Sequence, residues 1–117
     1  MALWAKRQLK WLQETLQWAD TQDFRHIIAC THTHFFMRDG SQGIASNFSI
    51  EENYALLNLF QTNGVEMVWT GHDHSREVTA YKDMTCIIVD SMKEEDKKPG
   101  YMLVTMGEKI GFEFVEL

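Results

Sequence analysis

Hydrophobic positions change their spacing along the chain, and these changes predict the order of helices and strands. Residues 4–19 carry large apolar side chains every three or four positions, which predicts an amphipathic helix. Residues 26–31 and 65–70 contain short apolar runs with little polar alternation. Such runs are typical of strands in a parallel sheet that is covered on both faces, so their side chains are expected to be buried.

A second helix is predicted between the two apolar runs. Residues 49–52 read Ser-Ile-Glu-Glu, a capping box in which Ser49 and Glu52 satisfy free backbone amides at a helix start. The helix is expected to end at Asn63-Gly64, which supplies a left-handed residue. Strand, helix and strand then form a right-handed crossover unit with parallel strands. Residues 36–47, which precede the helix, predict a long surface loop.

The last third of the chain changes to extended hairpins. Residues 77–81 and 85–89 form one predicted antiparallel pair, and residues 101–106 and 110–117 form another. The charged run 93–98 between them predicts a solvated loop without a function of its own. The predicted fold class is therefore α/β, with parallel strands and a crossover helix followed by antiparallel hairpins.

Composition limits the classes of function. The 117 residues fit one domain, 1–117, and 44% hydrophobic with 24% charged residues is ordinary for a globular protein. A net charge of −6 disfavours nucleic-acid binding, although a small phosphorylated substrate held by metal ions remains compatible with it. No apolar stretch reaches the roughly 18 residues of a membrane span. Because Lys6, Arg7 and Lys10 interrupt any signal-peptide segment, a cytoplasmic protein is expected.

Tryptophans and cysteines extend the predicted core. Trp4, Trp11 and Trp18 recur at heptad spacing on the first helix, where they are expected to be core residues, with a partner surface as the alternative. Cys30 and Cys86 lie inside apolar runs, which predicts reduced thiols that act as small buried hydrophobes.

Four of the five histidines follow the two predicted parallel strands. His32 and His34 come after the first strand, and His72 and His74 come after the second in the tetrapeptide Gly-His-Asp-His. Ligands of open α/β sheets lie outside the carboxyl ends of strands, so these side chains are expected to converge. Neutral imidazole suits Zn, Fe, Ni or Cu and tolerates Mn beside carboxylates. The spacing therefore predicts a metal site.

Other interpretations of these residues stay open. The histidines of the second pair could instead bind backbone groups in a loop. Cys30, His32 and His34 alternate along one strand face and could hold a single metal, and His34 could also be an additional ligand of the main site. His26, at a strand start, is expected to be a surface or hydrogen-bonded core residue rather than a ligand.

In these segments the sequence resembles the carboxyl-terminal half of the calcineurin-like metallophosphoesterases. Residues 27–32 look like the strand and histidine of the family's fourth motif, and residues 71–74 look like its fifth motif. Residues 8–12 are similar to the helix that precedes the fourth motif. Residues 63–65 and the closing hairpin at 99–101 also follow the family's pattern.

The resemblance implies a layered metallophosphoesterase sandwich with a dinuclear centre of Mn, Fe or Zn. His32 and His72 would bind one metal and His74 the other, and a metal-activated hydroxide would hydrolyse phosphomonoesters or phosphodiesters. The family's proline two residues after the fourth-motif histidine is His34 here, which changes the loop and adds a possible donor.

The family's earlier motifs, Asp-x-His, Gly-Asp and Gly-Asn-His-Asp/Glu, are absent from the sequence. Without the carboxylates of these motifs, we expect at most one weakly held metal and no activity of the chain alone. The expected partners are a phosphoester substrate in the complete enzyme, and an amino-terminal half or a second copy of the chain. The alternative function is a non-catalytic binding or assembly module with at most one histidine-bound metal.

Overall fold

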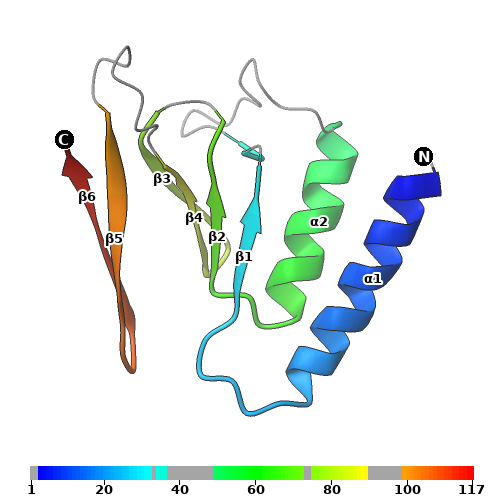
Figure 1. Cartoon of the computed structure of the whole chain (residues 1–117). Helices are drawn as coiled ribbons and strands as arrows, with labels where there is room; N and C mark the ends of the chain where they lie inside the picture. Colours follow the sequence, from blue (N-terminus) through cyan, green and yellow to red (C-terminus); the bar gives the residue numbers. More distant parts are fainter. Residues whose placement is uncertain (1–2, 33, 37–48, 73–74, 90–98) are drawn as a thin grey trace.

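The computed structural model describes residues 3–32, 34–36, 49–72, 75–89 and 99–117. Along these residues the elements are α1 (Leu3–Asp20), β1 (Ile28–Thr31), α2 (Ile50–Thr62), β2 (Met67–Thr70), β3 (Glu77–Tyr81), β4 (Met84–Ile88), β5 (Gly100–Met106) and β6 (Ile110–Glu116). Figure 1 shows three layers, with both helices on one face of a four-stranded sheet and the β5–β6 hairpin on the other. The predicted mixed α/β fold, with a parallel-strand sheet and a second antiparallel hairpin sheet, is confirmed.

The four-stranded sheet has the order β1-β2-β4-β3. β1 and β2 are parallel, with Ile28 opposite Met67 and Thr31 opposite Thr70, so the two strands end at the same edge. The β3–β4 hairpin is antiparallel as predicted. β4 also pairs in parallel with β2, with Thr70 opposite Ile88. The hairpin therefore widens the parallel sheet, a placement that the local pattern of the sequence did not indicate.

Both predicted ends of α2 are confirmed. Ser49 Oγ accepts a hydrogen bond from the amide of Glu52 at 3.2 Å, and the Glu52 carboxylate accepts one from the amide of Ser49 at 3.1 Å. The chain leaves the helix through Gly64, whose φ of +80° is readily adopted only by a residue without a β-carbon. These local signals determine where α2 begins and ends.

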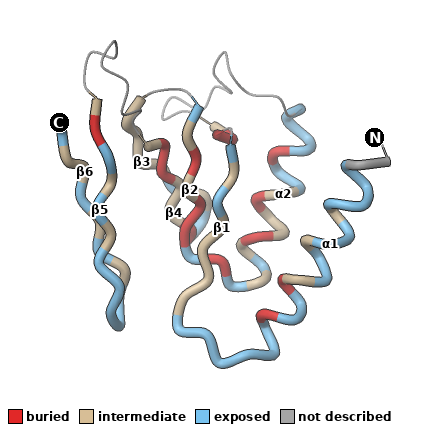
Figure 2. The backbone as a smooth tube through the Cα atoms, viewed as in Figure 1, coloured by how far each residue is buried: buried red, intermediate tan, exposed pale blue. Residues whose placement is uncertain are grey.

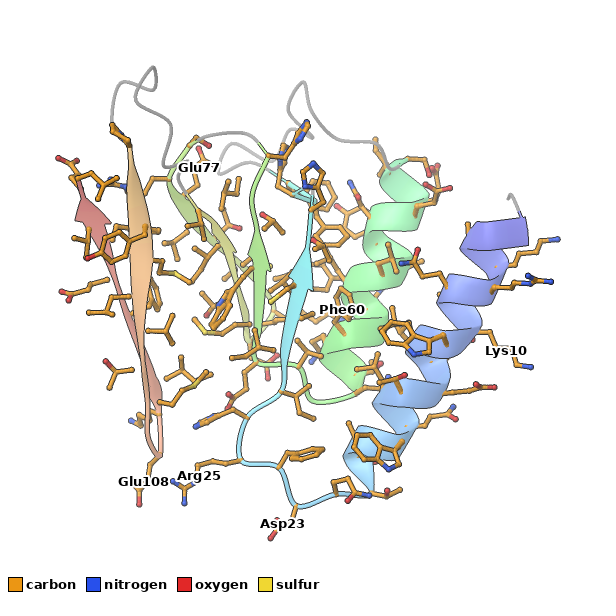
Figure 3. The ribbon with its side chains drawn as sticks, in the orientation of Figure 1. Lys10, Asp23, Arg25, Phe60, Glu77 and Glu108 are labelled. Carbon is orange, nitrogen blue, oxygen red and sulfur yellow. The ribbon has the colours of Figure 1, made fainter. Side chains whose placement is uncertain are left out.

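A cluster of buried apolar side chains lies between the helices and the four-stranded sheet. Figure 2 shows the buried positions concentrated on α2 and the central strands, and Figure 3 shows Phe60 between α2 and the sheet. Burial of each large apolar side chain contributes roughly 1.5–3 kcal/mol relative to exposure. The members of the cluster are Leu16, Phe35, Leu57, Phe60, Val65, Val68 and Met84.

Helix α1 covers the expected range but does not bury its tryptophans. Trp11 is 60% exposed and Trp18 is 55% exposed, so the prediction that they are core residues is wrong. The side chain of Trp4 lies outside the described residues. Leu16 and Ala19 are buried along a narrower line of the helix. α1 is the outermost helix in Figure 1, and the described residues cover only part of its broad apolar face.

Strand β1 is less covered than predicted. Its residues are half-buried or, at Cys30, exposed, whereas β2 is buried at Met67, Val68 and Thr70. The reason is its position at the edge of the sheet, where one side has no neighbouring strand among the described residues. Cys30 is therefore not a core residue. Cys86 is partly buried as predicted, and its burial raises the pKa of the thiol to about 11.

Two predicted segments lie wholly or largely outside the described residues. Of the loop 36–47 only Phe36 is described, and the charged run 93–98 lies outside the described residues. In the described part of the chain, neither helix combines the length and the apolar character needed to cross a membrane.

Candidate metal centre

Two neighbouring parallel strands deliver His32 and His72 to one edge of the sheet. β1 and β2 end in register, and their ladder continues one step further, where the Gly71 amide donates to the carbonyl of His32 at 3.1 Å. This bond keeps the two chain segments together just beyond the strands. The two histidines are consequently held side by side by backbone pairing, before any contact between their rings.

The imidazole rings of His32 and His72 meet edge to face. Their centroids are 4.6 Å apart and their planes cross at 68°. Both residues are exposed. A zinc ion lies about 2.0–2.1 Å from each ligating imidazole nitrogen, so two rings at this separation are near enough to share one ion after small side-chain rotations. The structure thus brings together two of the three predicted ligands.

The backbone of His72 adopts an uncommon conformation. Its φ is +69°, in the left-handed region that side chains with a β-carbon generally avoid. Such a residue costs about 1–3 kcal/mol and persists only where the surroundings impose it, and conformations of this kind cluster at functional sites. At His72 this conformation falls on a predicted ligand beside a second histidine.

The other proposed ligands are not gathered at this pair. His74 lies outside the described residues. His34 is only 1% exposed and borders a cavity of about 430 Å³ that is also lined by Phe35 and Thr70. Cys30 is exposed on the edge strand. In the part of the chain that the structure describes, no three His, Cys, Asp or Glu side chains are grouped to hold an ion. The alternative Cys30–His32–His34 site is therefore not assembled.

The donor chemistry fits a divalent metal, but the set of donors is incomplete. Two imidazoles are suitable ligands for Zn, Fe or Mn, whereas a catalytic zinc site commonly has three protein ligands, and a pair of ions needs carboxylates to balance its charge. The described residues place no such third ligand beside the two rings. The pair can contribute to a metal centre and cannot complete one.

His26 lies at the opposite ends of the same two strands. Its Nδ1 is 2.7 Å from the carboxylate of Glu66, and its Nε2 is 2.5 Å from the carbonyl oxygen of Gly107. The prediction that His26 is a hydrogen-bonded residue is confirmed. The in-register pairing of β1 with β2 could have identified Glu66 as its neighbour. Gly107 is 81 residues away in the sequence, and no local signal identifies it.

Comparison with known proteins relates this chain to others by fold. The structure is similar to that of GAP50, described as the anchor in the inner membrane complex of Plasmodium, with a TM-score of 0.67 and 20% sequence identity. The similarity covers 90% of this chain and 36% of the GAP50 chain, so this chain spans about a third of that protein. At this identity the similarity concerns the fold alone.

A weaker likeness is to Vps29 from Entamoeba histolytica, which was crystallised in complex with zinc. Its TM-score is 0.40 at 16% identity, over 62% of this chain and 49% of the other. This score is too low to support an inference. Neither a protein-family model nor a curated protein matches the sequence.

Proposed function

We propose that this chain is the carboxyl-terminal part of a metal-dependent phosphoesterase and that His32, His72 and His74 form the imidazole side of its metal centre. The observation that carries the proposal is the pair of exposed imidazoles, 4.6 Å apart, beyond the carboxyl ends of two parallel strands. The left-handed turn at His72 adds support, because it places backbone strain at the same point.

Each part of the proposed centre has a defined task. His32 and His72 would bind one ion as neutral imidazoles, and His74 would bind a second. A divalent ion such as Mn, Fe or Zn supplies a water of lowered pKa and stabilises negative charge on phosphoryl oxygens. The paired backbones of β1 and β2 would hold the two ligands in position, so that little reorganisation is needed when metal binds.

The proposal requires further ligands from outside the described residues. Carboxylates from an amino-terminal segment would balance the charge of the ions and complete their coordination. The limited coverage of GAP50, 36% of that chain, is consistent with a larger complete fold. The chain alone is therefore expected to bind metal weakly and to hydrolyse no phosphoester.

Reconstitution of activity tests this function. The chain is assayed with a chromogenic phosphoester and Mn²⁺, alone and co-expressed with the protein segment encoded directly upstream of Met1. Turnover is expected only with that segment, and His72→Ala is expected to abolish it without loss of folding, whereas His26→Gln retains it. Absence of turnover in the combined protein, or unchanged turnover in His72→Ala, would overturn the proposal.

A second candidate function is a non-catalytic assembly module. The exposed Trp11 and Trp18 on α1 favour it, because large aromatic side chains are enriched where proteins bind one another. Under this alternative the same upstream segment binds, but no phosphoester is hydrolysed. Trp11→Ser with Trp18→Ser should then weaken association measured by light scattering, while His72→Ala leaves association unchanged.

A further inference from the structure

His26 joins three separate parts of the chain. It lies two residues before β1, its carboxylate neighbour Glu66 lies one residue before β2, and Gly107 is in the turn between β5 and β6. The side chain of His26 is 11% exposed, while that of its partner Glu66 is 46% exposed, so the imidazole is largely covered and the carboxylate remains accessible to water. Through one imidazole, the turn of the outer hairpin is connected to the amino-terminal end of the parallel sheet.

The contacts of His26 require two protons on the ring. A carboxylate and a backbone carbonyl are both hydrogen-bond acceptors, so each ring nitrogen must donate to satisfy its neighbour. A neutral imidazole has one N–H and can satisfy only one of them. The doubly protonated ring satisfies both, and each of these bonds is strengthened by charge.

Some neighbouring groups raise the pKa of His26 and others lower it. The carbonyl of Gly107 and, after it, the hydrogen bond to Glu66 raise the pKa of His26, while desolvation and the neighbouring Arg25 oppose this rise. Glu108 and Lys109 follow Gly107 in the turn, and Figure 3 shows Glu108 and Arg25 at the same end of the molecule. Together these groups raise the pKa of His26 above its ordinary value.

The position of the β5–β6 hairpin is expected to depend on the hydrogen bond between His26 and Gly107. A two-stranded hairpin is marginally stable by itself, and β5–β6 pairs with no other strand among the described residues. Near its other end, Arg76 binds Glu116 at 3.2 Å and its guanidinium lies 5.3 Å from the ring centre of Phe114. The His26–Gly107 bond is the corresponding attachment at the turn.

We propose that His26 is a pH-sensitive clasp, which holds the β5–β6 turn against the four-stranded sheet when its imidazole carries two protons and loosens the turn when one proton is lost. A histidine whose folded pKa lies above its ordinary value of about 6.5 stabilises the docked state fully below that value. This stabilisation is lost as the pH rises through the folded pKa. The hairpin is therefore expected to be held most firmly in mildly acidic solution.

Nuclear magnetic resonance titration of the intact chain tests the clasp. The ring proton of His26 and the backbone amides of Gly107 and Ile110 are followed over the same pH series. We expect one shared midpoint above 6.5, a lower midpoint in Glu66→Gln, and no hairpin transition in His26→Gln. Glu108→Gln, which removes a nearby carboxylate outside the two hydrogen bonds, is the matched control and should retain the shared transition.

Two results would overturn the clasp. One is a His26 midpoint at or below 6.5 in the native chain, and the other is a hairpin transition that persists in His26→Gln. Should His26→Gln fail to fold, the Glu66→Gln titration decides alone, because an unchanged midpoint there would exclude the ion pair. The test uses no metal and no phosphoester, so its outcome is independent of the proposed hydrolase function.

Discussion

The two ends of the β1–β2 pair carry histidines in opposite situations. At the amino-terminal end, His26 is enclosed, with a carboxylate on one nitrogen and a carbonyl on the other. At the carboxyl-terminal end, His32 and His72 are exposed and face one another, and one of them sits on left-handed backbone. One pair of strands thus holds a histidine that already has its hydrogen-bond partners and two exposed histidines that we propose as metal ligands.

The difference shows that the neighbours of a histidine determine its chemistry. Acceptors on both nitrogens favour the charged imidazolium, which cannot bind a metal. Metals bind imidazole in its neutral form, through a nitrogen lone pair. The same strands can therefore support a structural attachment at one end and a binding site at the other.

We expect the strongest effect from a substitution in the hydrophobic core, because this core lies beneath both ends of the β1–β2 pair. Leu57, 1% exposed in α2, packs into the cluster beneath the central strands. Leu57→Ala should lower the free energy of unfolding by about 2–5 kcal/mol, since it leaves a cavity in the core. Urea denaturation measures this loss. Leu103→Ala, at a position 50% exposed on the hairpin, is the matched control and should change stability by no more than about 0.5 kcal/mol.

The second prediction separates the two ends by metal binding. His32→Ala or His72→Ala should weaken Zn²⁺ or Mn²⁺ binding at least tenfold, or about 1.4 kcal/mol, in isothermal titration calorimetry. His26→Gln should leave the affinity unchanged, because its ring lies at the other end of the strands. Equal affinities in all three variants would remove the distinction between the ends and, with it, the proposed metal centre.

The third prediction concerns the helix start nearest the exposed histidines. In Figure 1, α2 begins at the end of the sheet where β1 and β2 terminate, and its capping box depends on Ser49. Ser49→Ala should reduce stability by about 1 kcal/mol, because a backbone amide loses its acceptor. Thermal unfolding checks this. Ser49→Asn retains a capping side chain and should restore most of the loss.

The last prediction, with the smallest effect, is that increasing pH weakens the stabilisation by His26 and strengthens metal binding at His32 and His72. The raised pKa of His26 means that its stabilising contribution is complete below about 6.5 and declines as the pH increases through the folded pKa. Metal binding at His32 and His72 should instead strengthen as the pH increases, because protons compete with the ion. Unfolding experiments on the native chain and His26→Gln, with zinc titrations over the same pH series, measure both trends. If the stabilisation by His26 and the metal affinity both increased, or both decreased, with pH, the proposed difference between the two ends of the strands would be refuted.

Local chemistry made much of this fold predictable. The Ser49 capping box and the Gly64 helix end appear in the sequence because hydrogen bonds between near neighbours and backbone preferences determine them. The apolar runs ahead of His32 and His72 likewise predicted two parallel strands that end at one edge, and the structure places those two rings together. His74, the third predicted ligand, lies outside the described part of the chain.

Local patterns in the chain were sufficient to predict the helices and strands and to bring two histidines to one edge of the sheet. Tertiary structure decided the environment of each element: that β4 inserts between β2 and β3, that β1 is an edge strand with Cys30 exposed, and that α1 leaves Trp11 and Trp18 uncovered. It also decided that His26 meets Gly107 across 81 residues. The physical reason is that periodicity and capping act within a few residues, whereas burial and hydrogen-bond partners depend on which distant segment packs alongside.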